Sequence, residues 1–180
     1  MNFITMARNL YLLLTAIIIS TGCGDTTMNQ LPSSLQTSSL SGKDWTALSQ
    51  KKIYFGHMSV GYNIIEGIKD LMSKNPDIKL NIQDTVDISN VTSGVFAHSK
   101  IGQNGDPKSK IDAFVATMNS GMGSRADIAF FKFCYVDFDE KTDVKNVFNY
   151  YKTAMNGLLK KYPKTLIPHA TVPLKTEAET

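Results

Sequence analysis

A serine at a strand-to-helix turn is the residue of this sequence best placed to do chemistry. Ser59 lies in the run 55–61 (FGHMSVG), between a short apolar segment that predicts a strand and an apolar helical repeat that begins at Val60. At a helix N-terminus, free backbone N–H groups and the positive end of the dipole stabilise an oxyanion, and glycines allow a tight turn. The spacing predicts a serine nucleophile for acyl transfer, although it also fits a serine that merely caps the helix.

A serine hydroxyl needs a base to accept its proton, and the chain offers three histidines. His57 lies two residues before Ser59, His98 lies in a glycine-containing segment, and His169 lies near the end of the last predicted strand. Asp137 follows an apolar strand and could orient one of these histidines. Each also has a structural interpretation, as a packed or hydrogen-bonded histidine or as a loop acid, and the pattern alone leaves these alternatives open.

The other reactive side chains predict no metal or cofactor. No group of His, Cys and carboxylate residues has metal-ligand spacing. Residues 121–123 (GMG) precede a predicted strand instead of opening a helix, which argues against a phosphate loop. Cys134 lies in an apolar segment and is expected to be a buried core thiol. With Cys23 as the only other cysteine, a disulfide framework is not expected.

The charge balance argues against a nucleic-acid partner. The chain has 19 basic and 16 acidic residues and a formal net charge of +3. Its lysines are scattered instead of forming a dense basic stripe. The sequence specifies neither the substrate nor the oligomeric state.

The N-terminus has the pattern of an export signal. Arg8 precedes the apolar run 10–19, which is too short to span a bilayer. The following residues 20–23 (STGC) resemble a lipobox, with Ser20 in place of the usual leucine. We therefore expect residues 1–22 to be a lipoprotein signal peptide and Cys23 to carry a lipid, which would anchor the protein to a bacterial membrane outside the cytoplasm.

The mature chain is expected to consist of a tether and one domain. Residues 23–42 are poor in aromatic residues and rich in Ser, Thr and Gln, which is typical of a flexible segment. Residues 43–180 have the length of one domain.

Within this domain, strand and helix patterns alternate. An apolar run at 53–55, an alternating run at 78–82, a continuous apolar run at 126–136 and a run at 165–172 interrupted by Pro168 predict strands. Helical repeats predict helices at 60–72, 107–118 and 144–162. Residues 84–106 are expected to form a long loop that could contain a short element around Val95 and Phe96. This order is typical of a three-layer α/β/α fold with a parallel sheet.

In such a fold, reacting groups gather beyond the carboxyl ends of the strands. That rule selects four segments, which contain all the candidate catalytic residues named above: residues 57–61, 84–106, 134–137 and 169–173.

Three segments carry a resemblance to a known family. Residues 51–68 (KKIYFGHMSVGYNIIEGI) resemble the first block of a branch of the SGNH (GDSL) hydrolases that has a Gly-His-x-Ser-Val-Gly run. Residues 132–138 (KFCYVDF) and 169–174 (HATVPL) resemble later blocks. The resemblance implies a flavodoxin-like parallel sheet and a Ser-His-Asp type ester hydrolase with Ser59 as the nucleophile.

The resemblance also implies an oxyanion site. One donor would be the Ser59 N–H, and the second would come from the loop 100–106 (KIGQNGD), where we favour Gly105 and Asn104 over Gly102. An ordinary turn before a helix fits this loop as well.

The sequence departs from the family pattern in two places. Val136 stands where the family has an oxyanion asparagine, and the family's C-terminal Asp-x-x-His motif is absent. The sheet is therefore expected to be incomplete at the C-terminus. Two functions follow: a membrane-anchored serine esterase acting on a carbohydrate or another small ester, or a truncated, inactive lipoprotein domain with a binding or structural role.

Overall fold

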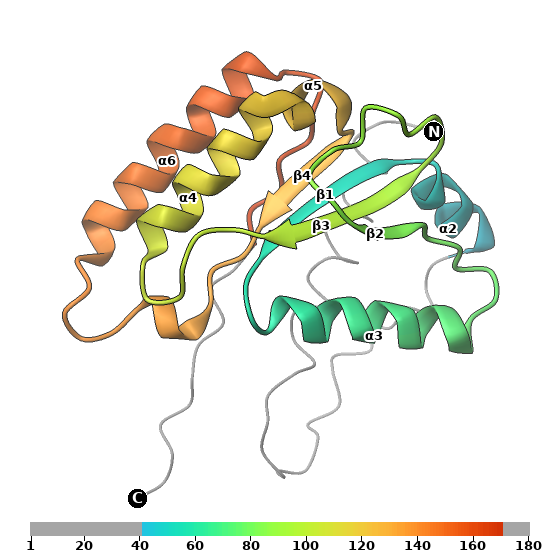
Figure 1. Ribbon diagram of the computed structural model, residues 1–180, viewed down its shortest axis with the longest axis horizontal. Coiled ribbons are helices and arrows are strands. Elements are labelled where there is room, and N and C mark those ends of the chain that lie inside the picture. The colour runs from blue at the N-terminus through green and yellow to red at the C-terminus, as the bar shows by residue number, and fades with distance from the viewer. Residues whose placement is uncertain (1–40, 171–180) are drawn as a thin grey trace, which may run out of the picture.

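A parallel four-stranded sheet forms the centre of the molecule. The computed structural model describes residues 41–170 (Figure 1). All neighbouring strands are parallel, and they lie in the order β2 (Ile82–Asp84), β3 (Val95–Lys100), β1 (Lys52–His57), β4 (Ile128–Phe131). Beyond β4, Leu166 forms an isolated parallel bridge with Ile128. The predicted α/β class with a parallel sheet is confirmed.

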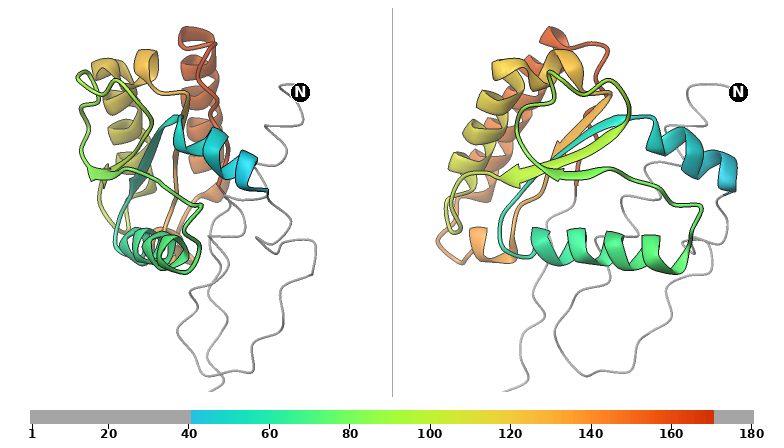
Figure 2. Two further views of the ribbon diagram at one scale, coloured as in Figure 1. Left: turned by 90° about the vertical axis from the view of Figure 1, so that its right-hand side faces the viewer. Right: turned by 45° about the vertical axis from the view of Figure 1, so that its right-hand side comes forward.

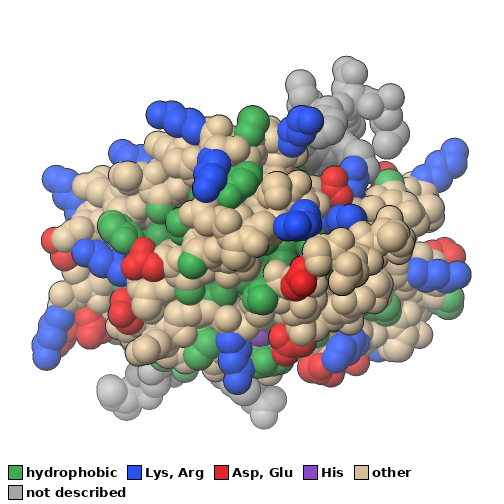
Figure 3. Space-filling model, turned by 45° about the horizontal axis from the view of Figure 1, so that its top comes forward, with side chains coloured by type: hydrophobic (Ala, Val, Ile, Leu, Met, Phe, Trp, Pro, Cys, Tyr) green, Lys and Arg blue, Asp and Glu red, His purple; other side chains and the backbone are tan. Residues whose placement is uncertain are grey.

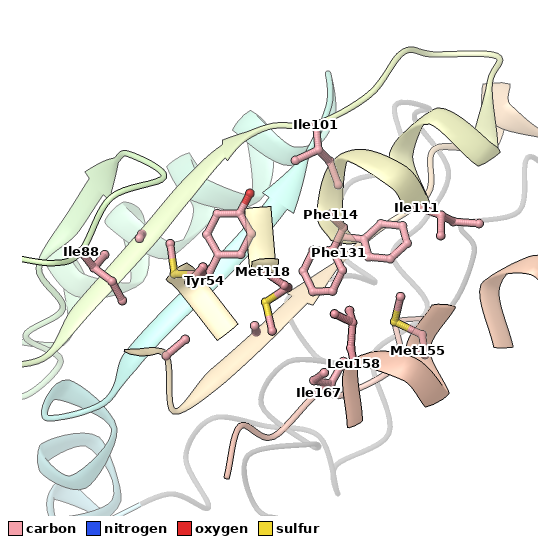
Figure 4. Packing of buried hydrophobic residues seen from close by; sticks show 14 of the residues in the cluster. Tyr54, Ile88, Ile101, Ile111, Phe114, Met118, Phe131, Met155, Leu158 and Ile167 are labelled. Atoms are coloured by element: carbon pink, nitrogen blue, oxygen red, sulfur yellow. The ribbon is translucent and has the colours of Figure 1, made fainter. Parts of the chain in front are cut away.

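Helices cover both faces of the sheet, because the side chains of each strand alternate between two apolar clusters. On one face, Ile53 and Phe55 of β1 pack with α2 (Gly42–Ser49) and α3 (Gly61–Lys74). On the other, Tyr54 packs with α4 (Pro107–Thr117) and α6 (Val144–Lys161). Figure 2 shows these three layers from the side, and Figure 4 shows the packing of the second cluster around Phe114 and Phe131.

The three predicted helices are confirmed, and side-chain caps explain where two of them, α4 and α6, begin. Asp106 accepts a hydrogen bond from the Ser109 N–H at 3.0 Å and Pro107 occupies the first turn of α4. Asp143 caps α6 in the same way, and Lys160 and Lys161 lie in its last turn. After α4 the chain continues through a π-helical turn (Met118–Met122) and a short helix, α5 (Gly123–Arg125).

Helix α2 was not predicted from the sequence: we assigned Ser41 and Gly42 to the tether, and residues 43–49 to the domain without a helix or strand. Its N-terminus carries a capping box, in which Ser41 and Asp44 bond each other's backbone N–H groups. Trp45 and Leu48 bury its apolar face against the sheet. The remaining residues of the proposed tether lie outside the described part of the chain.

The long loop predicted over residues 84–106 was wrong in its extent, because the short element expected around Val95 and Phe96 is a full inner strand, β3. The apolar pattern of β3 is broken by His98 and Ser99, which are both buried. Each is buried because it has a polar partner on β1: Tyr54 Oη lies 2.8 Å from Ser99 Oγ, and His57 Nε2 lies 3.1 Å from His98 Nδ1.

Three predicted strands are shorter in the structure than expected. The edge strand predicted at 78–82 is displaced to β2, which shares only Ile82 with it. The central strand predicted at 126–136 ends at Phe131 and gives way to a 3-10 turn (Tyr135–Asp137). Within the described residues the last predicted strand is reduced to the Leu166 bridge. Apolar runs therefore overstated the strand lengths, because burial continues into loops that pack without ladder hydrogen bonds.

Candidate functional site

Ser59 lies on a sharp turn at the carboxyl end of β1, directly before α3. Its side chain is exposed. Its φ is 41°, and no other non-glycine residue of the described chain has a positive φ. The turn is closed by hydrogen bonds from the Gly61 N–H to the Met58 carbonyl and from the Tyr62 N–H to the Ser59 carbonyl, both 2.9 Å. The residue that caps α3 is Val60, without a side-chain bond, so Ser59 does not serve as the helix cap.

The start of α3 offers free hydrogen-bond donors beside Ser59. Among residues 41–170, neither the Ser59 N–H nor the Val60 N–H donates to a protein acceptor. Orphan donors of this kind, at the positive end of a helix dipole, are suited to binding an anion or a developing oxyanion.

A buried ion pair organises the neighbouring loops. Lys110 of α4 and Asp137 are both fully buried, with Lys110 Nζ 2.6 Å from Asp137 Oδ2. The Asp137 carboxylate also accepts the Gly105 N–H at 3.0 Å and the Cys134 N–H at 2.7 Å. Asp137 thus ties the loop before α4 to the loop after β4 and does not bond a histidine.

The sequence analysis missed Lys110, although a signal was present. Lys110 occupies a position of the buried stripe of α4, between Pro107 on one side and Ile111 and Phe114 on the other. A lysine in such a stripe requires a buried acid, because an unpaired charge is too costly to bury.

The ion pair also bears on the two residues considered as oxyanion donors. The Gly105 N–H is already donated to Asp137, so it is not free to bind a substrate in this arrangement. Asn104 is exposed, and its Oδ1 accepts a hydrogen bond from Lys110 Nζ at 3.0 Å. With Oδ1 held in this way, the two N–H donors of the Asn104 amide face away from Lys110 and have no acceptor among the described residues. Of these two residues, only Asn104 therefore keeps hydrogen-bond donors that are free among the described residues.

Cys134 is buried, as expected, but it also has polar contacts. Its Sγ lies 3.2 Å from Lys132 Nζ and 3.6 Å from the carbonyl oxygen of Met58, the residue before Ser59. Lys132 Nζ also donates to the Phe133 carbonyl at 3.2 Å. The loop after β4 therefore contacts the Ser59 turn through a thiol.

The three histidines are divided between two places. His57 and His98 form a buried pair on the α3 face of the sheet, 3.1 Å apart between Nε2 and Nδ1. His169 is exposed, and its Nδ1 lies 2.6 Å from Tyr151 Oη of α6. None of them is hydrogen-bonded to Ser59 in residues 41–170.

Burial governs the ionisation of these groups. Desolvation, and then the neighbouring His98, lower the pKa of His57 to about 4, and desolvation also lowers the pKa of His98. The pair is therefore neutral at pH 7. Burial raises the pKa of Tyr151 to about 12, so that its hydroxyl remains protonated beside His169.

The described surface has other features that bear on function. Within residues 41–170 no three His, Cys, Asp or Glu side chains are grouped as a metal site. The same part of the chain contains no helix with the length and hydropathy needed to span a bilayer. On the face shown in Figure 3, basic and acidic side chains are interspersed. Cys23 and the predicted signal peptide lie outside the described residues.

Comparison with protein-family models, with curated proteins and with solved structures finds no match to this chain. Any function must therefore be argued from the geometry of the site and from the residues themselves.

Proposed function

We propose that this chain is a serine ester hydrolase of the SGNH type, anchored to a membrane by a lipid on Cys23 and acting outside the cytoplasm on a carbohydrate ester or another small ester. The observation that carries the proposal is the positive φ of the exposed Ser59. Strained backbone at a strand-to-helix turn costs free energy, and it is found where a nucleophile must be presented above a sheet.

In the proposed reaction, Ser59 Oγ attacks the ester carbonyl and the alcohol leaves, giving an acyl-enzyme that water hydrolyses. The developing oxyanion is stabilised by the free N–H groups of Ser59 and Val60 and by the Asn104 amide, which Lys110 orients. Asp137 positions the two loops and does not take part in proton transfer.

The proton of Ser59 needs an acceptor, and His169 is the best candidate of the three histidines. It is exposed and lies three residues after the Leu166 bridge beside β4, whereas His57 and His98 are buried against each other. Its contact with Tyr151 Oη would fix the ring orientation. Reaching Ser59 requires a movement of the segment that carries His169.

The proposal is tested by treating the full-length chain with a fluorophosphonate and mapping the label by mass spectrometry, alongside turnover of p-nitrophenyl acetate. We expect Ser59 to be labelled and the Ser59→Ala variant to lose both signals. If His169 is the base, His169→Ala lowers turnover by roughly 10²–10⁴-fold. A folded wild-type chain with no label on Ser59 would refute the hydrolase.

A second function is favoured by one observation. Among the described residues the Ser59 hydroxyl has no hydrogen-bond partner, and so no base is in place. This arrangement is compatible with a lipoprotein domain that binds a ligand or has a structural role without catalysis. Absence of labelling and turnover in a chain with an intact fold would support it.

A further inference from the structure

A row of ionisable side chains crosses the sheet beside the Ser59 turn, with one residue from each strand or its end. On β2, Asp84 lies opposite His98 of β3. His98 contacts His57 at the end of β1. Gly56 of β1 lies opposite Phe131 of β4, so the next residues of the two strands, His57 and Lys132, are also neighbours. Each of the four lies two positions after a residue that packs on the α3 side of the sheet, so all four lie on that face.

His57 is held directly beneath the first turn of α3. A Cβ atom added to Gly61 would lie only 2.3 Å from Cβ, Cγ and Nδ1 of His57, so the ring fills the space that this glycine leaves open. The ring also stacks on Phe55 and meets the edge of Tyr62, each with centroids 4.9 Å apart. His57 is 0% exposed, and its Nδ1 is a buried polar atom without a partner in the described chain.

The surroundings of the pair disfavour a positive charge on His57. In addition to desolvation, the positive charges of Lys132, which lies beside His57, and of Lys100, which lies over the Tyr62 ring, lower the pKa of His57. Lys69 of α3 lowers the pKa of His98 in the same way. The N-terminus of α3 adds the positive end of its dipole. Asp84 is the opposing acid, but it is exposed and interacts with Tyr62 Oη at 3.5 Å, while Glu66 pairs with Lys69.

We propose that the neutral His57–His98 pair is an acid-sensitive latch that positions the Ser59 turn, and that proton uptake by His57 releases its ring from beneath Gly61 and opens the turn. Opening exposes the imidazole to water, where its charge is solvated, and removes it from Lys132 and the helix end. The opening itself does not depend on the proposed hydrolase. Only its consequence, the loss of ester reactivity at Ser59, rests on that function.

The linkage between proton binding by His57 and opening of the Ser59 turn sets the size and direction of the pH effect on opening. His57 has a pKa of about 4 in the closed state and an ordinary value of 6.5 when solvated. Between these values the open state binds the proton more tightly, so the opening constant rises about tenfold for each pH unit lost, to about 300-fold in all. Above about pH 6.5 the latch stays closed and opening is independent of pH.

Hydrogen–deuterium exchange of the full-length chain tests the latch. The amides of Gly61, Tyr62 and Ile64 report on it, because they donate to Met58, Ser59 and Val60 and close the turn. After correction for intrinsic exchange rates, we expect their opening constant to rise about sevenfold between pH 6 and pH 5. In His57→Gln, which keeps a donor near the Nε2 position without a titrating group, the constant should stay flat.

His169→Gln is a matched control, because it removes the one histidine outside the pair. In this variant the opening constant of the turn should depend on pH as it does in the wild type. A wild-type opening constant that does not change with pH would overturn the latch, as would the same rise in His57→Gln. If His57→Gln fails to fold, the NMR titration of His57 in the wild type decides, since a pKa near 6.5 is incompatible with the latch.

Fluorophosphonate labelling over the same pH range separates the two proposals. Labelling that falls with acidification in step with opening supports both. A turn that opens at low pH while Ser59 is never labelled would leave the latch standing and refute the hydrolase.

Discussion

At the scale of single residues, Ser59 and His57 lie two positions apart and have opposite environments. Ser59 is exposed in a strained conformation, and His57 is fully buried in an ordinary strand. The turn between them connects the two, because Gly61 closes it and covers the His57 ring. Predictions at this scale therefore concern strain at residue 59 and the close approach at residue 61.

Replacement of Ser59 separates strain from chemistry. Ser59→Gly removes the penalty of a side chain at φ 41°, whereas Ser59→Ala keeps it. We expect Ser59→Gly to be more stable than Ser59→Ala by about 1 kcal/mol, with both unlabelled by fluorophosphonate. Urea denaturation of the two variants measures the difference, and equal stability would mean that the turn is unstrained.

Gly61→Ala should destabilise the chain through a clash with His57. The added methyl group would meet the His57 ring at 2.3 Å, which forces α3 or the ring to move and costs about 1–3 kcal/mol. In the His57→Ala background the same substitution should cost much less, because the ring is gone. A double-mutant cycle by urea denaturation measures the coupling; additivity would contradict the packing described here.

At the scale of elements, the buried Lys110–Asp137 pair joins α4 to the two loops at the carboxyl end of the sheet. A buried ion pair need not stabilise a fold relative to apolar residues, but loss of one partner leaves a buried charge uncompensated. The pair also orients Asn104, so its removal bears on the site as well as on stability.

Lys110→Met is expected to lower the free energy of unfolding by about 3–5 kcal/mol, because it leaves the Asp137 carboxylate buried without its cation. The matched control is Lys69→Met, which breaks the exposed pair with Glu66 and should cost no more than about 0.5 kcal/mol. Chemical denaturation of both variants tests the contrast. A cost for Lys110→Met as small as that of the control would contradict the buried pair.

At the scale of the whole molecule, the histidine pair makes stability depend on pH. Because the folded pKa of His57 is depressed to about 4, the unfolded chain binds more protons between pH 6.5 and 4. We expect the free energy of unfolding to fall by up to about 1.4 kcal/mol per pH unit in this window, about 3 kcal/mol in total. Above pH 6.5 this contribution is fully present.

Urea denaturation at pH 7 and pH 5 measures this dependence, and His57→Gln should remove most of it. Three exposed carboxylates also have lowered pKa values: Asp44, Asp87 and Asp139. Their protonation changes the free energy of unfolding only below their ordinary pKa of 3.8, so the change between pH 7 and pH 5 is assigned to the histidines. An unfolding free energy that is unchanged between the two pH values would show that His57 titrates normally in the folded chain.

The sequence by itself determined the features that depend on neighbouring residues. The periodic apolar faces of α3, α4 and α6 and the side-chain caps of α4 and α6 are local, and so is the position of Ser59 between a strand and a helix. These features sufficed to predict the α/β class and the turn that carries the candidate nucleophile.

Only the tertiary structure decided how buried polar residues are paired. The partners of His98 and Asp137 lie 41 and 27 residues away along the chain, so the local pattern could indicate a short element near Val95 and a buried lysine at position 110, but not the residues with which they pair. A polar side chain is stable in the interior only when a distant segment supplies its partner, and that pairing exists only after the strands have assembled.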